Sequence, residues 1–128
     1  MDKKTVFSLE APAPIGPYSQ AVAAGGLLWC SGAIPLDPQT GHIVGETAAQ
    51  QAEQVMKNLA AVLKAGGSSF AQVVRCGIFL SDLTDFASVN EVYGRYFAEG
   101  QAPARSTIEV GRLPRDVKVE IDAVAVIG

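Results

Sequence analysis

The sequence predicts an α+β fold in which two helices cover one face of a single sheet. The chain has 128 residues, which is near the usual size of one domain, and no linker, repeat or low-complexity tract interrupts it. Hydrophobic residues make up 48% and charged residues 18% of the chain, as in proteins with a packed core. Strand-like and helix-like runs alternate in the order β-β-β-α-β-α-β-β. We therefore expect residues 1–128 to form a single α+β domain.

The first part of the chain predicts three short strands and one irregular segment. Thr5–Leu9 has the composition of a short strand. The prolines of Ala11–Pro17 each fix their own φ and bias the preceding residue towards extended backbone. That segment is therefore stiff but irregular, and ordered irregular segments often line sites. Two further strands, Ser19–Ala24 and Leu27–Ser31, flank Gly25-Gly26, a pair typical of a hairpin turn.

The middle of the chain predicts the longest helix. Thr47 and Gln50 have the spacing of a capping box, and Gly66-Gly67 supplies a stop. Between them, apolar residues recur at i, i+3 and i+4 and form one stripe. The stripe consists of Ala52, Val55, Met56, Leu59, Val62 and Leu63.

The last part of the chain predicts a strand, a second helix and two more strands. Val73–Leu80 is an apolar run of the length of a buried strand. Phe86–Phe97 carries aromatic and aliphatic residues at helical spacing. Arg105–Val110 predicts a shorter strand, and in Val117–Ile127 apolar residues alternate strictly with others up to residue 123.

An antiparallel pairing of these last two strands would assemble a polar surface. Closing the loop between them sets Thr107 opposite Glu120 and Arg105 opposite Asp122. Lys118, Glu120 and Asp122 would then occupy the face away from the helices. Because that face is hard to bury inside one chain, we hypothesise that subunits associate through it and form a site in the seam.

Charge and cysteine content narrow the class of protein. The net charge is -3, so no broad attraction for nucleic acid is expected. The N-terminus lacks the apolar stretch of a secretion signal, and no run approaches the roughly 20 apolar residues of a membrane span. Cys30 and Cys76 lie in strand-like runs without a CxxC pair or a cluster of metal-ligand spacing. We expect reduced core thiols, a cytoplasmic location, and neither metal nor cofactor.

Two residues are the strongest candidates for binding and catalysis. Arg105 follows the rigid Ala102-Pro103-Ala104 segment, and a guanidinium can bind a carboxylate through two parallel N–H bonds. The alternative is a surface ion pair with Glu109 or Asp122. Glu120 lies within a strand of small apolar residues, where it could deprotonate a water or return a proton to a leaving amine. The alternative for Glu120 is a buried structural acid.

Two more residues are candidates for the walls of a pocket. Tyr18 follows the proline-rich segment and could close a pocket with its ring and hydroxyl. Its alternative is a packed tyrosine at a strand start. Asn90 lies on the second helix and could hydrogen-bond a ligand or, equally, a backbone group.

Five segments, in order, resemble the Rid family of reactive intermediate deaminases, and its archetypal RidA subgroup in particular. They span nearly the whole chain, and their combination is far more specific than any one of them. The segments are APAPIGPYSQAV (11–22), LLWCSGAIPLDPQTGHIVG (27–45), QAEQVMKNLAAVLKAGG (51–67), VNEVYGRYF (89–97) and APARSTIEVGRLPRDVKVEIDAVA (102–125).

The resemblance implies a chorismate-mutase-like α+β fold with two helices packed on one face of a mixed sheet. It also implies a homotrimer with a barrel core and three inter-subunit clefts. In the family, such clefts hydrolyse 2-aminoacrylate, 2-iminopropionate and related imines to 2-keto acids and ammonia without a cofactor, which protects pyridoxal-phosphate enzymes. The implied activity is that of a 2-iminobutanoate/2-iminopropanoate deaminase.

The resemblance also assigns roles to individual residues. Arg105 would hold the substrate carboxylate, and Glu120 would position the attacking water. The substrate-binding residues would be Tyr18, Ser31, Gly32, Asn90 and Thr107. Two positions depart from the family pattern: Thr107 stands where some relatives have cysteine, and Ala33 where glutamine is frequent.

Three other functions remain open at this point. The first is a non-enzymatic regulatory trimer that binds small carboxylates in the same clefts. The second is a ribonuclease or translation inhibitor, which the acidic composition disfavours. The third is chorismate mutase activity, which only the fold analogy suggests.

Overall fold

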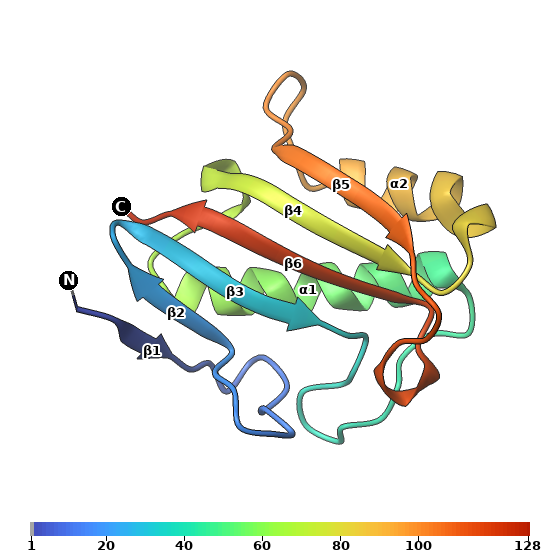
Figure 1. Cartoon of the computed structure of the whole chain (residues 1–128), viewed down its shortest axis with the longest axis horizontal. Coiled ribbons are helices and arrows are strands. Elements are labelled where there is room, and N and C mark those ends of the chain that lie inside the picture. The colour runs from blue at the N-terminus through green and yellow to red at the C-terminus, as the bar shows by residue number, and fades with distance from the viewer. Residues whose placement is uncertain (1) are drawn as a thin grey trace.

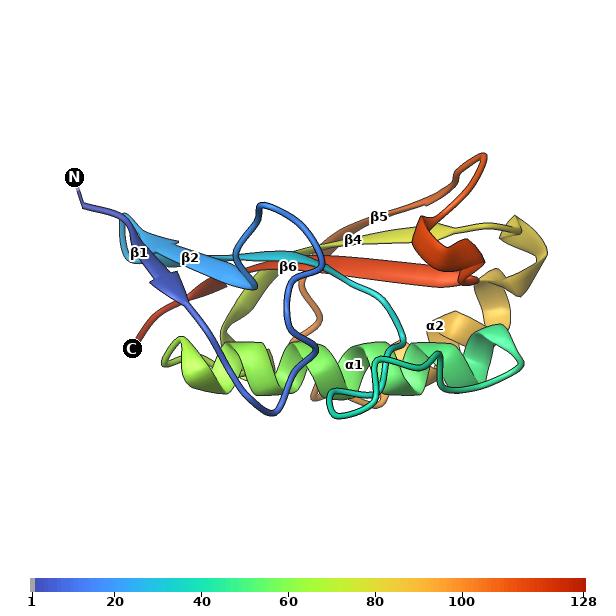
Figure 2. The ribbon, with the colours of Figure 1, turned by 90° about the horizontal axis from the view of Figure 1, so that it is seen from below.

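A computed structural model describes residues 2–128, which form one six-stranded mixed sheet with both helices on the same face (Figure 1, Figure 2). The strand order in the sheet is β1-β2-β3-β6-β4-β5. All pairs are antiparallel except β4 with β5, which is parallel. The strands are β1 (Lys4–Val6), β2 (Ala21–Ala24), β3 (Leu27–Ala33), β4 (Val73–Leu80), β5 (Ala104–Glu109) and β6 (Val119–Val126). The element order and the α+β class are therefore as predicted.

Helix α1 (Ala48–Ala65) has the predicted bounds. Thr47 accepts a hydrogen bond from the Gln50 N–H at 3.2 Å, and the Gln50 side chain accepts one from the Thr47 N–H at 3.2 Å. This capping box satisfies backbone donors that the first turn would otherwise leave unpaired. At the other end, the Gly66 N–H bonds the Val62 carbonyl and closes the helix.

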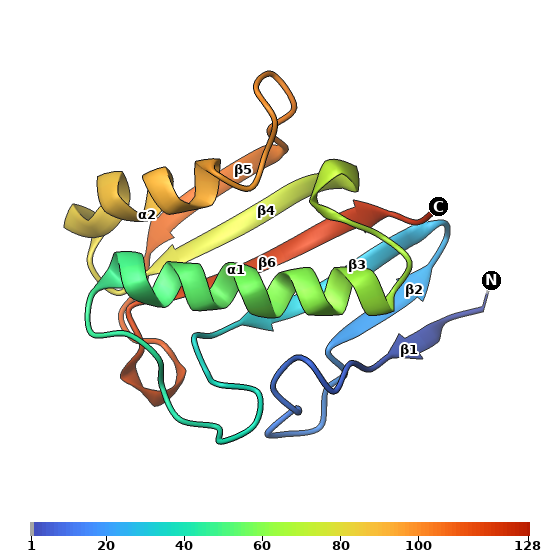
Figure 3. The same cartoon turned by 180° about the vertical axis from the view of Figure 1, so that it is seen from behind.

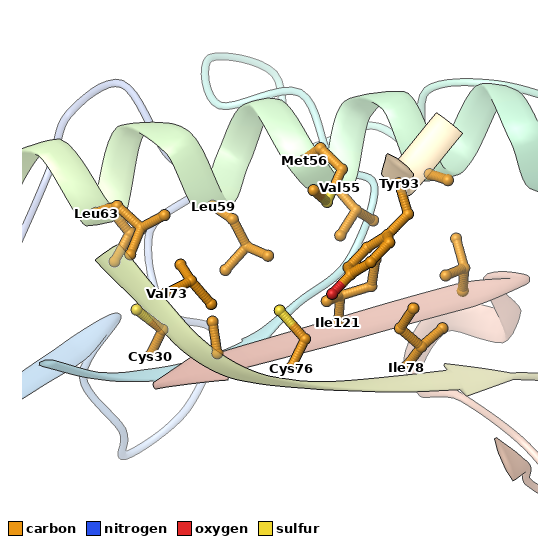
Figure 4. Packing of buried hydrophobic residues seen from close by; sticks show 14 of the residues in the cluster. Cys30, Val55, Met56, Leu59, Leu63, Val73, Cys76, Ile78, Tyr93 and Ile121 are labelled. Atoms are coloured by element: carbon orange, nitrogen blue, oxygen red, sulfur yellow. The ribbon is translucent and has the colours of Figure 1, made fainter. Parts of the chain in front are cut away.

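The hydrophobic core lies between the helices and the sheet (Figure 3, Figure 4). The apolar stripe of α1 is buried, and it meets the inner face of the sheet. Strand β6 shows the predicted alternation, because its odd-numbered residues are buried and Glu120 and Asp122 point the other way. Burial of each large aliphatic side chain here stabilises the fold by about 1.5–3 kcal/mol.

The predicted pairing of the last two strands is wrong. Strand β4 lies between them, so Thr107 is opposite Ile78 and Arg105 is opposite Cys76. The intervening loop is not a hairpin turn. It contains a 3-10 turn at Pro114–Asp116 in which Arg115 and Asp116 adopt left-handed backbone, with φ of 58° and 57°. The chain thereby passes over the end of β4 instead of folding straight back.

Helix α2 (Phe86–Gly94) is shorter than predicted. Its expected last turn, up to Phe97, instead forms hydrogen bonds to the carbonyl three residues earlier, as in the Tyr96 N–H to the Tyr93 carbonyl. This tighter turn ends the helix and brings the chain towards β5. Several strand ends also differ from the prediction by a few residues.

No helix or strand of residues 2–128 covers the sheet face opposite the helices (Figure 2). Trp29, Ile108 and Val126 lie on it with exposed fractions of 49%, 48% and 41%. We call this surface the open face. Trp29 and Val126 are on the neighbouring strands β3 and β6, whereas Ile108 is across the sheet on β5. Exposed apolar side chains on one sheet face are available for an interaction.

Among the described residues, no helix combines the length and the apolar character required to cross a membrane.

Candidate functional site

The predicted site residues other than Thr107 lie in two groups on opposite faces of the sheet. Glu120 is opposite Phe79 of β4, whereas Arg105 is opposite Cys76. Because side chains alternate along a strand, Phe79 and Cys76 point to opposite faces. Cys76 is fully buried beneath the helices (Figure 4). Arg105 is therefore on the helix side of the edge strand β5, and Glu120 is on the open face.

The first group, which we call the Arg105 half-site, consists of Arg105, Phe86, Asn90 and Tyr93. Arg105 Nη1 donates to Asn90 Oδ1 at 2.6 Å. The guanidinium carbon lies 5.2 Å from the centroid of the Tyr93 ring and 5.6 Å from that of Phe86. All three partners come from one side of α2. Since Arg105 is exposed, its remaining N–H groups can take up a carboxylate in a bidentate pair.

The second group lines a hollow that we call the Glu120 groove. The irregular segment before β2, the end of β3 and the turn before β6 form its walls. The lining residues are Ile15, Tyr18, Ser31, Gly32, Ile34, Pro114 and Glu120. Four predicted site residues are thus brought together, and none of them belongs to the Arg105 half-site.

The Glu120 carboxylate lies directly against the backbone of Gly32. A Cβ added to Gly32 would be 2.3 Å from Glu120 Oε2, so a side chain there would displace the carboxylate. Within residues 2–128 this carboxylate accepts no hydrogen bond. Partial burial raises the pKa of Glu120 above its usual range, and the negative charge of Asp122 raises it further. A carboxyl with a raised pKa is suited to accept and return protons.

Asp122 is held more firmly than Glu120. Its Oδ1 accepts a hydrogen bond from the Gly77 N–H at 2.8 Å across the β4–β6 pair. Gly77 also leaves room for it, because a Cβ there would be 2.6 Å from the same oxygen. Asp122 is therefore a fixed negative charge on the open face.

Tyr18 and Ser31 form the rim of the Glu120 groove. The Tyr18 hydroxyl accepts a hydrogen bond from the Ile15 N–H at 3.4 Å, and 48% of the residue is exposed. The Ser31 hydroxyl donates to the Ser19 carbonyl at 2.6 Å, and its N–H donates to the Gln20 carbonyl at 2.9 Å. The donors of Ser31 are thus engaged within the chain, which leaves its acceptor atoms for a ligand.

The positions of Thr107 and Asn90 in one chain differ from those expected of residues that contact a ligand. The Thr107 hydroxyl is buried and, in the described part of the chain, has no hydrogen-bond partner. A ligand at the surface of one chain would not reach it. Asn90 presents its oxygen to Arg105, so its first role in this chain is to orient the arginine.

Sequence reasoning missed two buried amides that hold the groove in shape. Gln20 donates to the Ser8 carbonyl at 3.1 Å and to the Pro12 carbonyl at 2.9 Å, which ties down the proline-rich segment. Asn58 donates to the carbonyls of Ile34 and Leu36 at 3.1 and 2.9 Å. The available signal was the position of Asn58 inside the apolar stripe of α1, where an amide needs partners.

Metal ligands are not gathered in the part of the chain that the structure describes. No group of three or more His, Cys, Asp or Glu side chains is arranged there to hold a metal ion.

Fold and site together define a small α+β protein with an exposed, oriented arginine on one side of the sheet and a partly buried acid of raised pKa on the other. The family described as Endoribonuclease L-PSP matches residues 8–127, and the chain belongs to this family. Among its relatives is "Protein DfrA" of Myxococcus xanthus, which is 59% identical over 98% of this chain and 97% of the relative.

Two other relatives bear deaminase names. The "2-iminobutanoate/2-iminopropanoate deaminase" of Salmonella typhimurium is 47% identical over 96% of this chain and 97% of its own. The chloroplastic "Reactive Intermediate Deaminase A" of Arabidopsis thaliana is 48% identical over 96% of this chain and 66% of its own. These names confirm the resemblance to the Rid family, and they show that the family contains deaminases.

A solved structure with the same fold is that of E. coli TdcF with bound serine. It has a TM-score of 0.91 and 43% identity, and the match covers 98% of this chain and 99% of the other. A relative of this fold therefore holds a small amino acid.

Proposed function

We propose that this chain is a hydrolytic deaminase of reactive 2-enamine and 2-imine intermediates. It converts compounds such as 2-aminoacrylate and 2-iminopropionate to 2-keto acids and ammonia, and so protects pyridoxal-phosphate enzymes. The observation that supports this most is the pair of complementary half-sites: a guanidinium that is already oriented, and a carboxyl that is unbonded and has a raised pKa. The deaminase names of the relatives support the same reaction.

Arg105 binds the carboxylate of the substrate. Its guanidinium is planar, permanently charged and fixed by Asn90 and by two rings, so little side-chain entropy is lost when the substrate binds. Recognition through the carboxylate leaves the side chain of the imino acid free to vary.

Glu120 manages the protons of the hydrolysis. Water adds to C2 of the iminium while Glu120 takes one of its protons, which gives a carbinolamine. The acid returns that proton to the amine nitrogen, the C2–N bond breaks and ammonia leaves. The remaining hydroxyl proton is lost as the keto group forms. Because the imine carbon is already electrophilic, orientation and one positioned water suffice.

The complete site forms between subunits of a homotrimer whose sheets make a central barrel. In one chain, Arg105 and Glu120 point away from each other across the sheet, so a second copy must supply the missing half. The exposed Trp29, Ile108 and Val126 of the open face provide apolar surface for this assembly. Residues 1–128 act as one domain of this kind. The buried, unpaired Cys30 and Cys76 suit the reducing cytoplasm.

The family description names an endoribonuclease, but this chain is better suited to a small acid. Its net charge is -3, whereas binding an RNA backbone needs a positive surface. Glu120 and Asp122 also add negative charge to the open face.

The first test is turnover. A pyridoxal-phosphate serine or threonine dehydratase generates the imine, semicarbazide traps what escapes, and keto-acid release is followed for wild type and Arg105→Ala. Loss of the charged pair is expected to lower kcat/KM about 1000-fold, equivalent to about 4 kcal/mol. Arg95→Ala, at the exposed residue that follows α2, is the matched control and is expected to keep full activity. Full activity of Arg105→Ala would refute the assignment. Carboxylate binding without turnover in wild type would favour the regulatory trimer.

The second test concerns the assembly. Arg105→Ala and Glu120→Gln chains are co-expressed with different tags, and the mixed oligomer is purified. If each site takes Arg105 from one subunit and Glu120 from its neighbour, every mixed trimer contains one intact site in three, so activity returns to about a third of the wild-type value. A mixture that stays as inactive as its parents would place both residues of a site in the same chain.

A further inference from the structure

Tyr93 forms the inner side of the Arg105 half-site. Its ring centroid lies 5.2 Å from the guanidinium carbon of Arg105, which is closer than the 5.6 Å of Phe86. The two rings also differ in freedom. Phe86 is 40% exposed at the surface, whereas Tyr93 is 4% exposed and is packed within the core.

Other aromatic rings hold Tyr93 in place. Its ring lies 4.8 Å from that of Phe97, and Phe97 makes an edge-on contact with Phe70 at 5.5 Å. Contacts of this geometry favour one orientation of each ring. Tyr93 therefore cannot turn aside without disturbing residues that lie beyond the site.

The Tyr93 hydroxyl has no evident structural task. It points into the core between Cys76 and Ile121 (Figure 4), and it finds no hydrogen-bond partner in residues 2–128. Burial raises the pKa of Tyr93, so the hydroxyl remains neutral there. The hydroxyl lies beside the Cys76 thiol, which is a weak hydrogen-bonding group, so the larger contribution of this residue comes from its ring.

The hydrogen bond to Asn90 does not by itself fix the orientation of the Arg105 guanidinium. The hydrogen bond from Arg105 Nη1 fixes one nitrogen, but the group can still tilt about that contact. A ring face beneath it removes this tilt, because a cation is attracted to the face of an aromatic ring and not to its edge. Together, the amide and the ring define the plane of the guanidinium and the direction of its remaining N–H groups.

From this arrangement we infer that Tyr93 is a positioning residue, whose buttressed ring sets the plane in which Arg105 meets a carboxylate. The inference rests on the proposed function only in naming the carboxylate as that of an imino acid. It does not require Tyr93 to touch the substrate, and it assigns no role to the tyrosine hydroxyl.

The test compares two substitutions at one position. Tyr93→Phe keeps the ring and removes the unpartnered hydroxyl, and Tyr93→Leu keeps apolar bulk and removes the ring. We expect Tyr93→Leu to raise KM on the order of tenfold with a smaller change in kcat, and Tyr93→Phe to restore wild-type KM. Phe7→Leu is the aromatic control, because Phe7 follows β1 at the sheet edge opposite β5 and lies outside the ring cluster that holds Tyr93. Its KM is expected to stay at the wild-type value.

A measurement without turnover separates this inference from the proposed function. The NMR signal of the Arg105 Nε–H reports guanidinium motion, and a titration with pyruvate reports carboxylate binding. Tyr93→Leu is expected to increase that motion and weaken pyruvate binding, while Tyr93→Phe changes neither. If wild type binds pyruvate but hydrolyses no imine, the proposed reaction fails and the positioning role stands.

Two results would overturn the inference: unchanged Arg105 motion in Tyr93→Leu, or equal losses in Tyr93→Leu and Tyr93→Phe. Should Tyr93→Leu fail to fold, the same measurements are made on Tyr93→Met, which fills the space with a flexible side chain.

Discussion

The Arg105 half-site is built by one stretch of chain, whereas the Glu120 groove needs three that are far apart in the sequence. Helix α2 and strand β5 supply everything that holds Arg105. The groove instead requires the proline-rich segment and the end of β3 to meet the turn before β6. The two also differ in how their charged groups are held. Arg105 has three partners in the chain, but the Glu120 carboxylate accepts no hydrogen bond within residues 2–128.

This difference suits the two tasks that we propose. A group that binds gains from being fixed in advance, because less entropy is lost when the ligand arrives. A group that exchanges protons gains from a pKa near the working pH, and strong donors would lower the pKa of a carboxyl. In the proposed site, the chain therefore holds the carboxylate-binding Arg105 tightly and leaves the proton-exchanging Glu120 unbonded.

The largest expected effect comes from removing the charge of Glu120 while keeping its shape. Glu120→Gln is expected to lower kcat on the order of 10²–10⁴-fold with little change in KM, because substrate is held by Arg105. The measurement is steady-state kinetics in the dehydratase-coupled assay. Equal losses in kcat and in substrate affinity would show that substrate binding and proton transfer are not separated between the two half-sites.

The same variant has a consequence for stability. The pKa of Glu120 is raised in the folded chain, so ionisation there costs stability, and the cost is absent below the usual glutamate pKa of about 4.3. Glu120→Gln is therefore expected to have a higher Tm than wild type at pH 7, and the difference is expected to shrink as the pH falls. A lower Tm at pH 7 would mean that the ionised carboxyl is stabilised by a partner.

A smaller effect is expected when the carboxylate is only displaced. Gly32→Ala places a methyl group where Glu120 Oε2 now lies, and the side chain can swing away. We expect a folded protein with kcat reduced on the order of tenfold, since small misplacements of a catalytic group are costly. Gly111→Ala is the matched control, because a Cβ there meets nothing within 4 Å. Normal kcat in Gly32→Ala would show that the position of Glu120 is not critical.

The smallest expected effect is a shift in pH dependence. Asp122 raises the pKa of Glu120, and Asp122→Asn removes that charge while keeping an oxygen for the Gly77 N–H. The pKa of Glu120 then falls, so the acid limb of the kcat profile moves to lower pH. Glu99→Gln, in an exposed turn, changes the net charge equally and is expected to leave the limb in place. An unmoved limb in Asp122→Asn would assign it to another group.

Local sequence patterns predicted the helices and strands well, but they did not predict which strands are adjacent in the sheet. The capping box of Thr47 and Gln50 gave the start of α1, and the apolar run Val73–Leu80 coincides with β4. The pairing of β5 with β6 failed because strands adjacent in sequence are usually adjacent in a sheet, and nothing in β4 itself reveals that it lies between them.

The same limit applies to the site. The resemblance to the Rid family places the predicted site residues in one cleft. Of these, Glu120, Tyr18, Ser31 and Gly32 line one groove, whereas Arg105 lies outside it. The rings around Arg105 and the amide of Gln20 could not be predicted, since their contacts exist only after separate elements have packed together. Residue chemistry can be recognised in a sequence, whereas the support of a side chain depends on the tertiary fold.

The place of β6 in the sheet also bears on how the chain folds. This strand follows all the others in the sequence, yet it joins β3 to β4 and so connects two otherwise separate halves of the sheet (Figure 1). On a ribosome, β4, α2 and β5 can pack as a local unit, while one edge of β3 stays unpaired until β6 is made. Such long-range pairing is slow and leaves apolar strand edges exposed for longer. The stretch most open to misfolding is therefore β3, which carries Gly32, and in the proposed trimer no copy can offer Glu120 to another before β6 has inserted.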